Sequence, residues 1–150
     1  MKKFRFKNYE LMENNIMLKE DGFICNGKVA IKENLTLINK SSNVNYLTLK
    51  EMARKLNISL NPSWKSLINV LEINEINIDD LVEVEISNQR NNFFTPIFLK
   101  NSQLNRRVEN VIIDRFMAIS PEIKLYTNKY FSKVFIVLNN EIIGLFMTAM

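Results

Sequence analysis

The last thirteen residues of the chain constrain its fold more than any other stretch. One apolar run ends at Leu138, a second extends from Ile142 to Met147, and Asn139 and Asn140 lie between the two runs. Two polar, turn-forming residues between β-forming runs predict a β-hairpin, because asparagine tolerates the backbone conformations that a tight turn requires. The chain therefore needs a sheet into which this apolar hairpin can pack.

A second hairpin is predicted nearer the N-terminus. Residues 23–25 and 28–31 are rich in β-forming side chains, and Asn26-Gly27 lies between them. An Asn-Gly pair in this position is the strongest short-range hairpin signal, since both central residues of the favoured turn need positive φ.

Three helices are predicted in the first half of the chain. Apolar residues recur at helical spacing from Tyr9 to Lys19, and Asp21-Gly22 would end this helix. Thr48 and Glu51 have the spacing of a capping box, which begins a helix that reaches about Leu56. Pro62 suits the first turn of another helix, through about Leu71.

The remaining elements are mostly strands. Phe4 and Phe6 alternate with cationic residues, as in a short strand with one apolar face. Further strands are expected over 76–86, 93–99, 123–126, 134–138 and 142–147, with a strand passing into a short helix over 108–119. Hairpins and clustered helices predict an α+β fold, in which two or three helices cover a mostly antiparallel sheet. We expect a single domain over 1–150, with a helical pair at 48–71 inside it.

Composition places the chain among globular proteins. It has 150 residues and one cysteine, and no apolar run approaches the length that crosses a bilayer. No signal-peptide pattern follows the basic start, so we expect the cytoplasm of a bacterial host cell and no membrane partner. The 22 Asn and 18 Ile, and the excess of Lys over Arg, indicate an AT-rich genome, as in a low-GC bacterium or its phage.

Residue content argues against conventional catalysis. The chain has no histidine, which removes Ser-His and Cys-His catalysis and metal sites that histidine ligates. Without an activating histidine, Cys25 is interpreted as a packed small side chain. Asp114, Glu122 and Lys124 resemble the Asp…Glu-x-Lys arrangement of metal-dependent nucleases, but this pattern is short and common by chance. We therefore expect no enzyme activity, no cofactor and no metal site.

Residues 47–59 resemble the first helix and turn of bacterial helix-turn-helix regulators. The resemblance implies that the second helix would lie in the major groove of DNA. An αα-hairpin that covers a sheet is the alternative, because the second helix is strongly apolar. The candidate DNA-binding residues are Arg54, Lys55, Ser63, Lys65, Ser66 and Asn69.

Two further patterns concern binding. Phe93, Phe94 and Phe98 lie near Arg90, a composition typical of base-stacking platforms, and we interpret these rings as core residues. The net charge is +4, and its surplus lies in the first half of the chain, which is compatible with a polyanionic partner.

The segments 111–119, 121–126, 134–138 and 141–147 together resemble the C-terminal portion of a domain of the bacterial sliding clamp, the β subunit of DNA polymerase III. The resemblance implies a clamp-like fold and a DNA-processing setting. A true clamp chains three such domains, whereas this chain has the length of one.

These observations favour a non-catalytic binding protein of a phage or mobile element. It would dock on a host protein or nucleoprotein complex, such as the replication machinery or a CRISPR-type defence nuclease, and modulate or inhibit it. The alternative is a DNA-binding regulator that uses residues 48–71. Apolar Leu145, Phe146 and Met150 leave a homodimer open.

Overall fold

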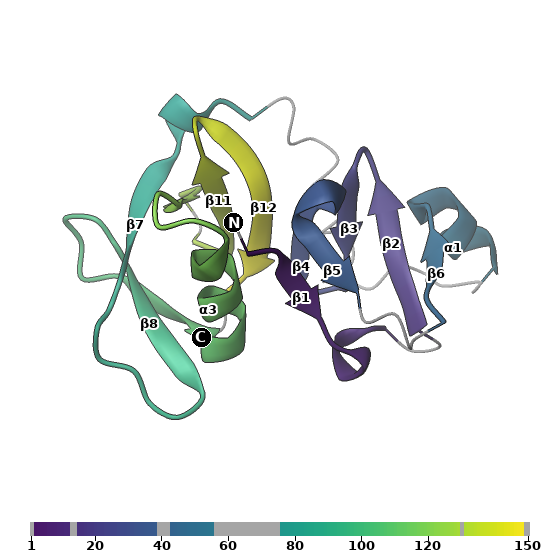
Figure 1. Cartoon of the computed structure of the whole chain (residues 1–150). Coiled ribbons are helices and arrows are strands. Elements are labelled where there is room, and N and C mark those ends of the chain that lie inside the picture. Colours follow the sequence, from purple (N-terminus) through teal and green to yellow (C-terminus); the bar gives the residue numbers. More distant parts are fainter. Residues whose placement is uncertain (1, 13–14, 39–42, 56–75, 130, 149–150) are drawn as a thin grey trace. The chain divides into compact units, whose positions relative to one another are not determined.

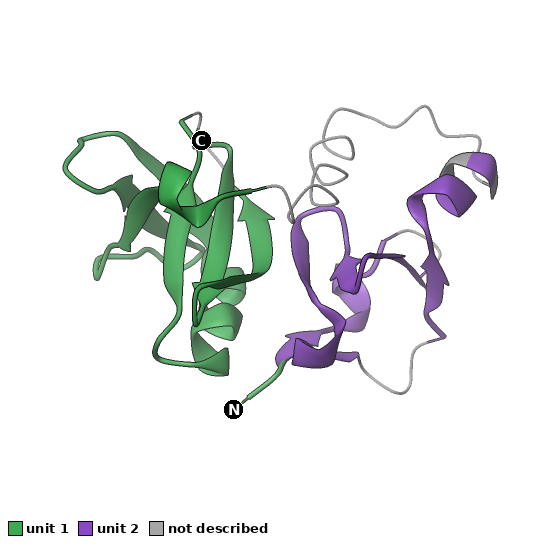
Figure 2. Ribbon diagram, turned by 90° about the horizontal axis from the view of Figure 1, so that it is seen from above, with its two compact units in different colours: residues 1–3, 76–150 green, residues 4–75 purple. Residues whose placement is uncertain are grey.

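The computed structural model describes residues 2–12, 15–38, 43–55, 76–129 and 131–148. The chain divides into two compact units, which Figure 2 shows in different colours. Unit 1 comprises residues 1–3 and 76–150, and unit 2 comprises residues 4–75. The expectation that 1–150 forms a single domain stays a prediction.

Unit 2 contains a sheet and a separate ribbon of two strands (Figure 1). In the sheet, β2 pairs antiparallel with β3 and parallel with β6, while β3 pairs antiparallel with β4. In the ribbon, β1 and β5 run parallel. The strands are β1 (Phe4–Phe6), β2 (Ile16–Glu20), β3 (Phe23–Cys25), β4 (Val29–Lys32), β5 (Thr36–Ile38) and β6 (Asn45–Leu47), and short 3-10 helices occupy Asn8–Glu10 (η1) and Glu33–Leu35 (η3).

The predicted helix from Tyr9 to Lys19 is wrong. The segment contains η1 and then strand β2, which pairs with β3 so that Glu20 lies opposite Phe23. The two residues left between these strands, Asp21 and Gly22, both have positive φ, 49° and 82°. Asp-Gly therefore makes a tight hairpin turn, and it does not terminate a helix.

The predicted hairpin around Asn26-Gly27 is confirmed as the pair β3–β4, but its turn is longer than expected. Cys25 pairs with Ala30, and of the four residues between them only Gly27 has positive φ. The Asn26 side chain closes the turn by accepting hydrogen bonds from the amides of Lys28 and Val29, at 3.0 and 2.9 Å. The Asn26 side-chain oxygen thus takes the place of a backbone carbonyl as the acceptor inside this turn.

Helix α1 (Leu49–Lys55) begins where the capping residues predict. The hydroxyl of Thr48 accepts a hydrogen bond from the amide of Glu51, at 3.1 Å. The carboxylate of Glu20 accepts another from the amide of Leu49, at 3.4 Å, which fixes the start of α1 against β2. The second predicted helix, from Pro62 to about Leu71, lies outside the described residues.

Unit 1 contains an antiparallel sheet with strand order β12-β11-β10-β7-β8-β9. Helix α3 (Asn110–Ile119) follows β9 directly and packs on β8 and β9. The strands are β7 (Val82–Ile86), β8 (Phe94–Leu99), β9 (Asn105–Glu109), β10 (Lys124–Thr127), β11 (Lys133–Leu138) and β12 (Glu141–Met147), and a short 3-10 helix, η5, occupies Ile78–Asp80. All of these strands match predicted ones except β9, which begins earlier than expected.

The C-terminal hairpin supplies much of the core of unit 1. Leu138 pairs with Glu141, so Asn139 and Asn140 alone form the turn, and both have positive φ, 53° and 61°. From β12, Phe146 packs near Phe116 of α3, with ring centroids 6.2 Å apart. Burying such aromatic side chains is among the larger single contributions to a core.

The fold is broadly α+β, as predicted, and it is dominated by sheet. Parallel pairing is confined, among the described strands, to β1–β5 and β2–β6. Among the described helices, none is both long and apolar enough to cross a membrane.

Candidate functional site

The structure describes only Arg54 and Lys55 of the predicted DNA-binding residues. Arg54 is exposed on α1, and Lys55 is the last residue of that helix. Ser63, Lys65, Ser66 and Asn69 lie outside the described residues. The DNA-binding site therefore stays a prediction.

The carboxylate of Asp114 forms an ion pair with an arginine. Both of its oxygens accept hydrogen bonds from the guanidinium of Arg90, at 2.8 and 2.9 Å. A nuclease that used Asp114 with Glu122 would need these oxygens for a divalent ion. Among the described residues, no group of three or more acidic or cysteine side chains is placed to hold a metal ion.

Cys25 is buried in the β3–β4 hairpin. Burial raises the pKa of its thiol to about 12, although a hydrogen bond from the Gly27 amide works in the opposite direction. The thiolate is the nucleophilic form, so this group is held in its unreactive state at neutral pH.

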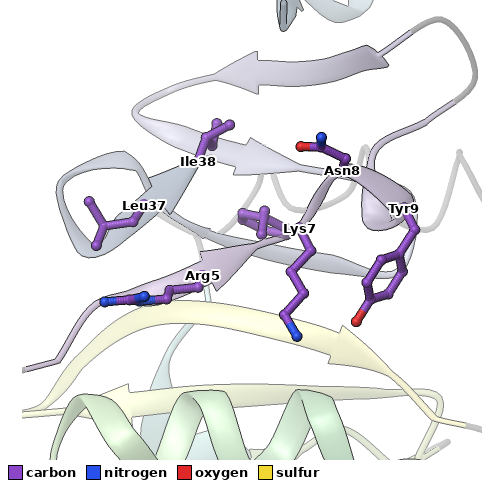
Figure 3. Close-up of a pocket in the computed structure, with 7 residues that line it drawn as sticks. Arg5, Lys7, Asn8, Tyr9, Leu37 and Ile38 are labelled. Carbon is purple, nitrogen blue, oxygen red and sulfur yellow. The ribbon is translucent and has the colours of Figure 1, made fainter. Parts of the chain in front are cut away.

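A hollow of unit 2 lies along the ribbon, and we call it the β1–β5 groove (Figure 3). Its volume is about 640 Å³, which is within the range of ligand-binding pockets. The residues that line it are Arg5, Phe6, Lys7, Asn8, Tyr9, Leu37 and Ile38.

Strand alternation places the cations of the groove. Phe4 and Phe6 are buried, with ring centroids 4.8 Å apart, so Arg5 between them faces the opposite side of the ribbon. In the parallel register Arg5 lies beside Leu37, which is also exposed. Burying the two phenylalanines therefore presents a cation next to an apolar side chain.

The 3-10 helix η1 contributes the aromatic side chain of Tyr9 to the groove. The Lys7 amide donates to the Glu10 carboxylate, at 3.2 Å, and the Asn26 side chain donates to the Glu10 carbonyl, at 3.0 Å. The first bond closes η1 on itself and the second ties it to the β3–β4 hairpin, while the Tyr9 side chain is left 72% exposed. The Lys7 ammonium lies 5.9 Å from the centre of the Tyr9 ring, and Figure 3 shows both side chains extending in the same direction.

The chemistry of the groove suits an anion that carries apolar groups. Among the described residues, its lining contributes two cations, Arg5 and Lys7, and no carboxylate. Leu37, Ile38 and the Tyr9 ring add apolar surface beside these charges. An anionic ligand with an apolar or aromatic neighbour would be recognised by charge and by burial together.

Only part of this groove was visible in the sequence. The alternation of Phe4 and Phe6 with cations predicts the strand and its charged face. Nothing local indicates that Leu37 pairs beside Arg5, because the two strands are joined in parallel across thirty residues of chain.

A smaller hollow of about 360 Å³ lies between β2 and α1. Two of its charged residues already serve the fold: Glu20 accepts from the start of α1, and Lys19 forms an ion pair with Glu33, at 2.9 Å. We therefore place the candidate site in the β1–β5 groove.

Two expectations about apolar side chains need correction. Leu145 and Phe146 are buried in β12, so they cannot form the dimer surface suggested by the sequence, and Met150 lies outside the described residues. Phe93 is not a core residue, since it is 73% exposed, whereas Phe94 and Phe98 are partly buried.

Comparison of the chain with protein-family models, curated proteins and solved structures gives no match.

Proposed function

We propose that this protein is a non-catalytic binding protein of phage or mobile-element type, which docks on a host DNA-processing complex and modulates or inhibits it. The replication machinery and a CRISPR-type defence nuclease are the two target classes. The observation that carries the binding role is the β1–β5 groove, with Arg5 and Lys7 beside exposed Tyr9 and Leu37. We assign the docking contact to this groove.

An acidic protein segment fits the groove better than nucleic acid does. A DNA-binding surface of ordinary affinity neutralises several phosphates along an extended path of cations. The described lining of the groove offers two cations, flanked by the apolar side chains of Leu37 and Ile38. A short peptide with carboxylates and one apolar or aromatic residue would use all of these features.

Peptide binding tests this assignment directly. Fluorescence anisotropy would compare a labelled peptide of alternating Glu and Phe with the same peptide carrying Gln for Glu, and with a labelled random DNA duplex. We expect the acidic peptide to bind more tightly than either probe, and Lys7→Glu to abolish the difference between the peptides. The matched control is Lys28→Glu, which makes the same charge change at an exposed position outside the groove lining.

Three results would contradict the assignment. The acidic and neutral peptides would bind equally, or Lys28→Glu would weaken binding as much as Lys7→Glu. Tight duplex binding with a steep salt dependence, lost in Lys7→Glu, would show that the groove binds nucleic acid instead of an acidic peptide.

The wider role needs purified target complexes. Size-exclusion chromatography with a replicative polymerase–clamp assembly, and separately with a CRISPR-type nuclease, should give a stoichiometric complex with one class, together with altered activity of that target. Self-association without any such complex would contradict the proposal.

The second candidate is a DNA-binding regulator that uses residues 48–71. The capped start of α1 at Thr48 and the exposed Arg54 support it. It predicts that Lys65→Ala weakens binding to duplex DNA and reduces the salt dependence of that binding. Unchanged binding in Lys65→Ala would leave the segment a structural role.

A clamp-like fold of the C-terminal part belongs to the same proposal. The order of elements from α3 through β10 and β11 to β12 supports it, since the resemblance implies a helix followed by apolar strands. A solved structure in which these elements superpose on a clamp domain would be the test.

A further inference from the structure

The outer edge of β9 has its backbone groups turned away from the sheet of unit 1. The Asn110 amide donates to the Phe93 carbonyl, at 2.8 Å, and the Leu99 amide donates to the Leu104 carbonyl, at 3.2 Å. Backbone groups alternate in direction along an antiparallel strand. The amide and carbonyl of Arg107 and the amide of Glu109 therefore point away from β8, and no described strand of unit 1 lies beyond them. Glu109 is the N-cap of α3, so its carbonyl accepts the first hydrogen bond of that helix.

The side chains of β9 alternate between two faces. Val108 is buried opposite Thr95, whose hydroxyl lies 2.6 Å from the side-chain oxygen of Asn110 at the start of α3. Val108 thus faces α3, and Arg107 and Glu109 lie on the opposite face. On that face the Arg107 guanidinium stacks over Phe94, 4.3 Å from its ring centroid, which holds the arginine against the sheet.

We infer that the edge of β9 binds a second copy of this chain as an antiparallel strand, with Val108 on the twofold axis. This register places Arg107 opposite Glu109 of the second copy, and it does so twice because of the symmetry. In each pair the outward amide of Glu109 can donate to the outward carbonyl of Arg107 in the other copy, so the twofold axis gives two backbone hydrogen bonds. Charge pairing and backbone pairing therefore select the same register.

Neighbouring registers are unfavourable. A shift that centres the axis on Arg107 or on Glu109 opposes two like charges across the strand pair. If the axis lies between two neighbouring residues, Arg107 and Glu109 of one copy each oppose a residue on the Val108 face of the other. The charges that protect an edge strand from unselective pairing here permit one selective pairing.

Exposed apolar residues lie at both ends of the edge. Leu104 precedes β9 and is 47% exposed, while Val111 follows it in α3 and is 44% exposed. In the antiparallel arrangement, the end of one copy that carries Leu104 meets the end of the other that carries Val111. The interface joins short strands, so the dimer is expected to be weak and dependent on concentration.

Sedimentation velocity of the full chain over a micromolar-to-millimolar series tests this inference. The wild type should shift from monomer to dimer, and Arg107→Glu and Glu109→Arg should each weaken self-association by about tenfold or more, because each opposes like charges. Mixing the two variants in equal amounts should restore a dimer, since every cross-strand pair then joins opposite charges. The double variant should also dimerise.

The matched control is Lys124→Glu, which reverses a charge at an exposed position of β10, away from the β9 edge. It should dimerise as the wild type does, and circular dichroism should show that every variant is folded. Arg107→Gln replaces Arg107→Glu if the latter does not fold, with weakened self-association again expected. A wild type that stays monomeric at millimolar concentration, or a mixture of the charge-reversal variants without a dimer, would overturn the inference.

Discussion

The guanidinium of Arg90 donates two hydrogen bonds to the carboxylate of Asp114, at 2.9 and 2.8 Å. Arg90 belongs to the connection between β7 and β8, and Asp114 lies in the middle of α3. The pair therefore ties a long loop to the helix that covers the sheet. The planar, two-point geometry is the most specific form of an ion pair.

Removing Asp114 should have a small effect on stability. Both side chains remain about half exposed, so solvent and salt screen the pair, and Asp114→Ala should lower the denaturation midpoint only slightly. Urea denaturation of wild type, both single variants and the double variant would give the coupling between the residues. The coupling should shrink in high salt, and a large coupling that is insensitive to salt would contradict this view.

Local signals predicted the C-terminal hairpin well, whereas long-range pairing was not predictable. Asn139-Asn140 and the apolar runs on either side suffice to predict this hairpin and its turn, because the signal is local in the sequence. The apolar residues after Tyr9 recur at helical spacing, which predicts a helix. The segment forms strand β2 instead, because the Asp21-Gly22 turn brings it into pairing with β3.

The same reasoning explains what could be predicted of the candidate groove. Arg5 and Lys7 were visible as a basic, alternating strand, but their apolar neighbours Leu37 and Ile38 come from a parallel partner. Such a pairing leaves no local pattern, because its register depends on the packing of Phe6 beneath the ribbon.

The turn at Asn139-Asn140 offers a sharp stability test. Both residues have positive φ, which costs a residue such as alanine about 1–2 kcal/mol. Asn140→Ala should therefore lower the free energy of unfolding by about 1 kcal/mol, and Asn140→Gly should leave it equal or higher. Chemical denaturation measures both. Asn88→Ala, at an exposed position without positive φ, should change little.

Cys25 should be inert in the folded protein. We expect no reaction with a disulfide reagent until the chain is unfolded, because burial keeps the thiol protonated, with a pKa of about 12. Rapid stoichiometric labelling of the native protein would contradict the buried placement.

The same thiol should make stability fall in alkali. The folded pKa of about 12 lies above the ordinary value of 9.0, so the unfolded chain releases this proton at lower pH than the folded one. The contribution is fully present below pH 9 and is lost progressively as the pH rises toward 12. Denaturation midpoints across this range should fall less steeply in Cys25→Ala than in the wild type.

Tyr9 should contribute to the groove through its ring. If an acidic peptide with an aromatic residue occupies the groove, Tyr9→Ala should weaken its binding about tenfold, the usual cost of truncating an aromatic contact residue. Tyr9→Phe should bind nearly as well as the wild type, because the ring and its position beside Lys7 are retained. Tyr46→Ala is the matched control: this tyrosine is also exposed and has Lys19 5.7 Å from its ring centre, but it does not line the groove. Equal losses in Tyr9→Ala and Tyr46→Ala would show that the peptide is held by nonspecific aromatic contact, and the groove would then have no special role.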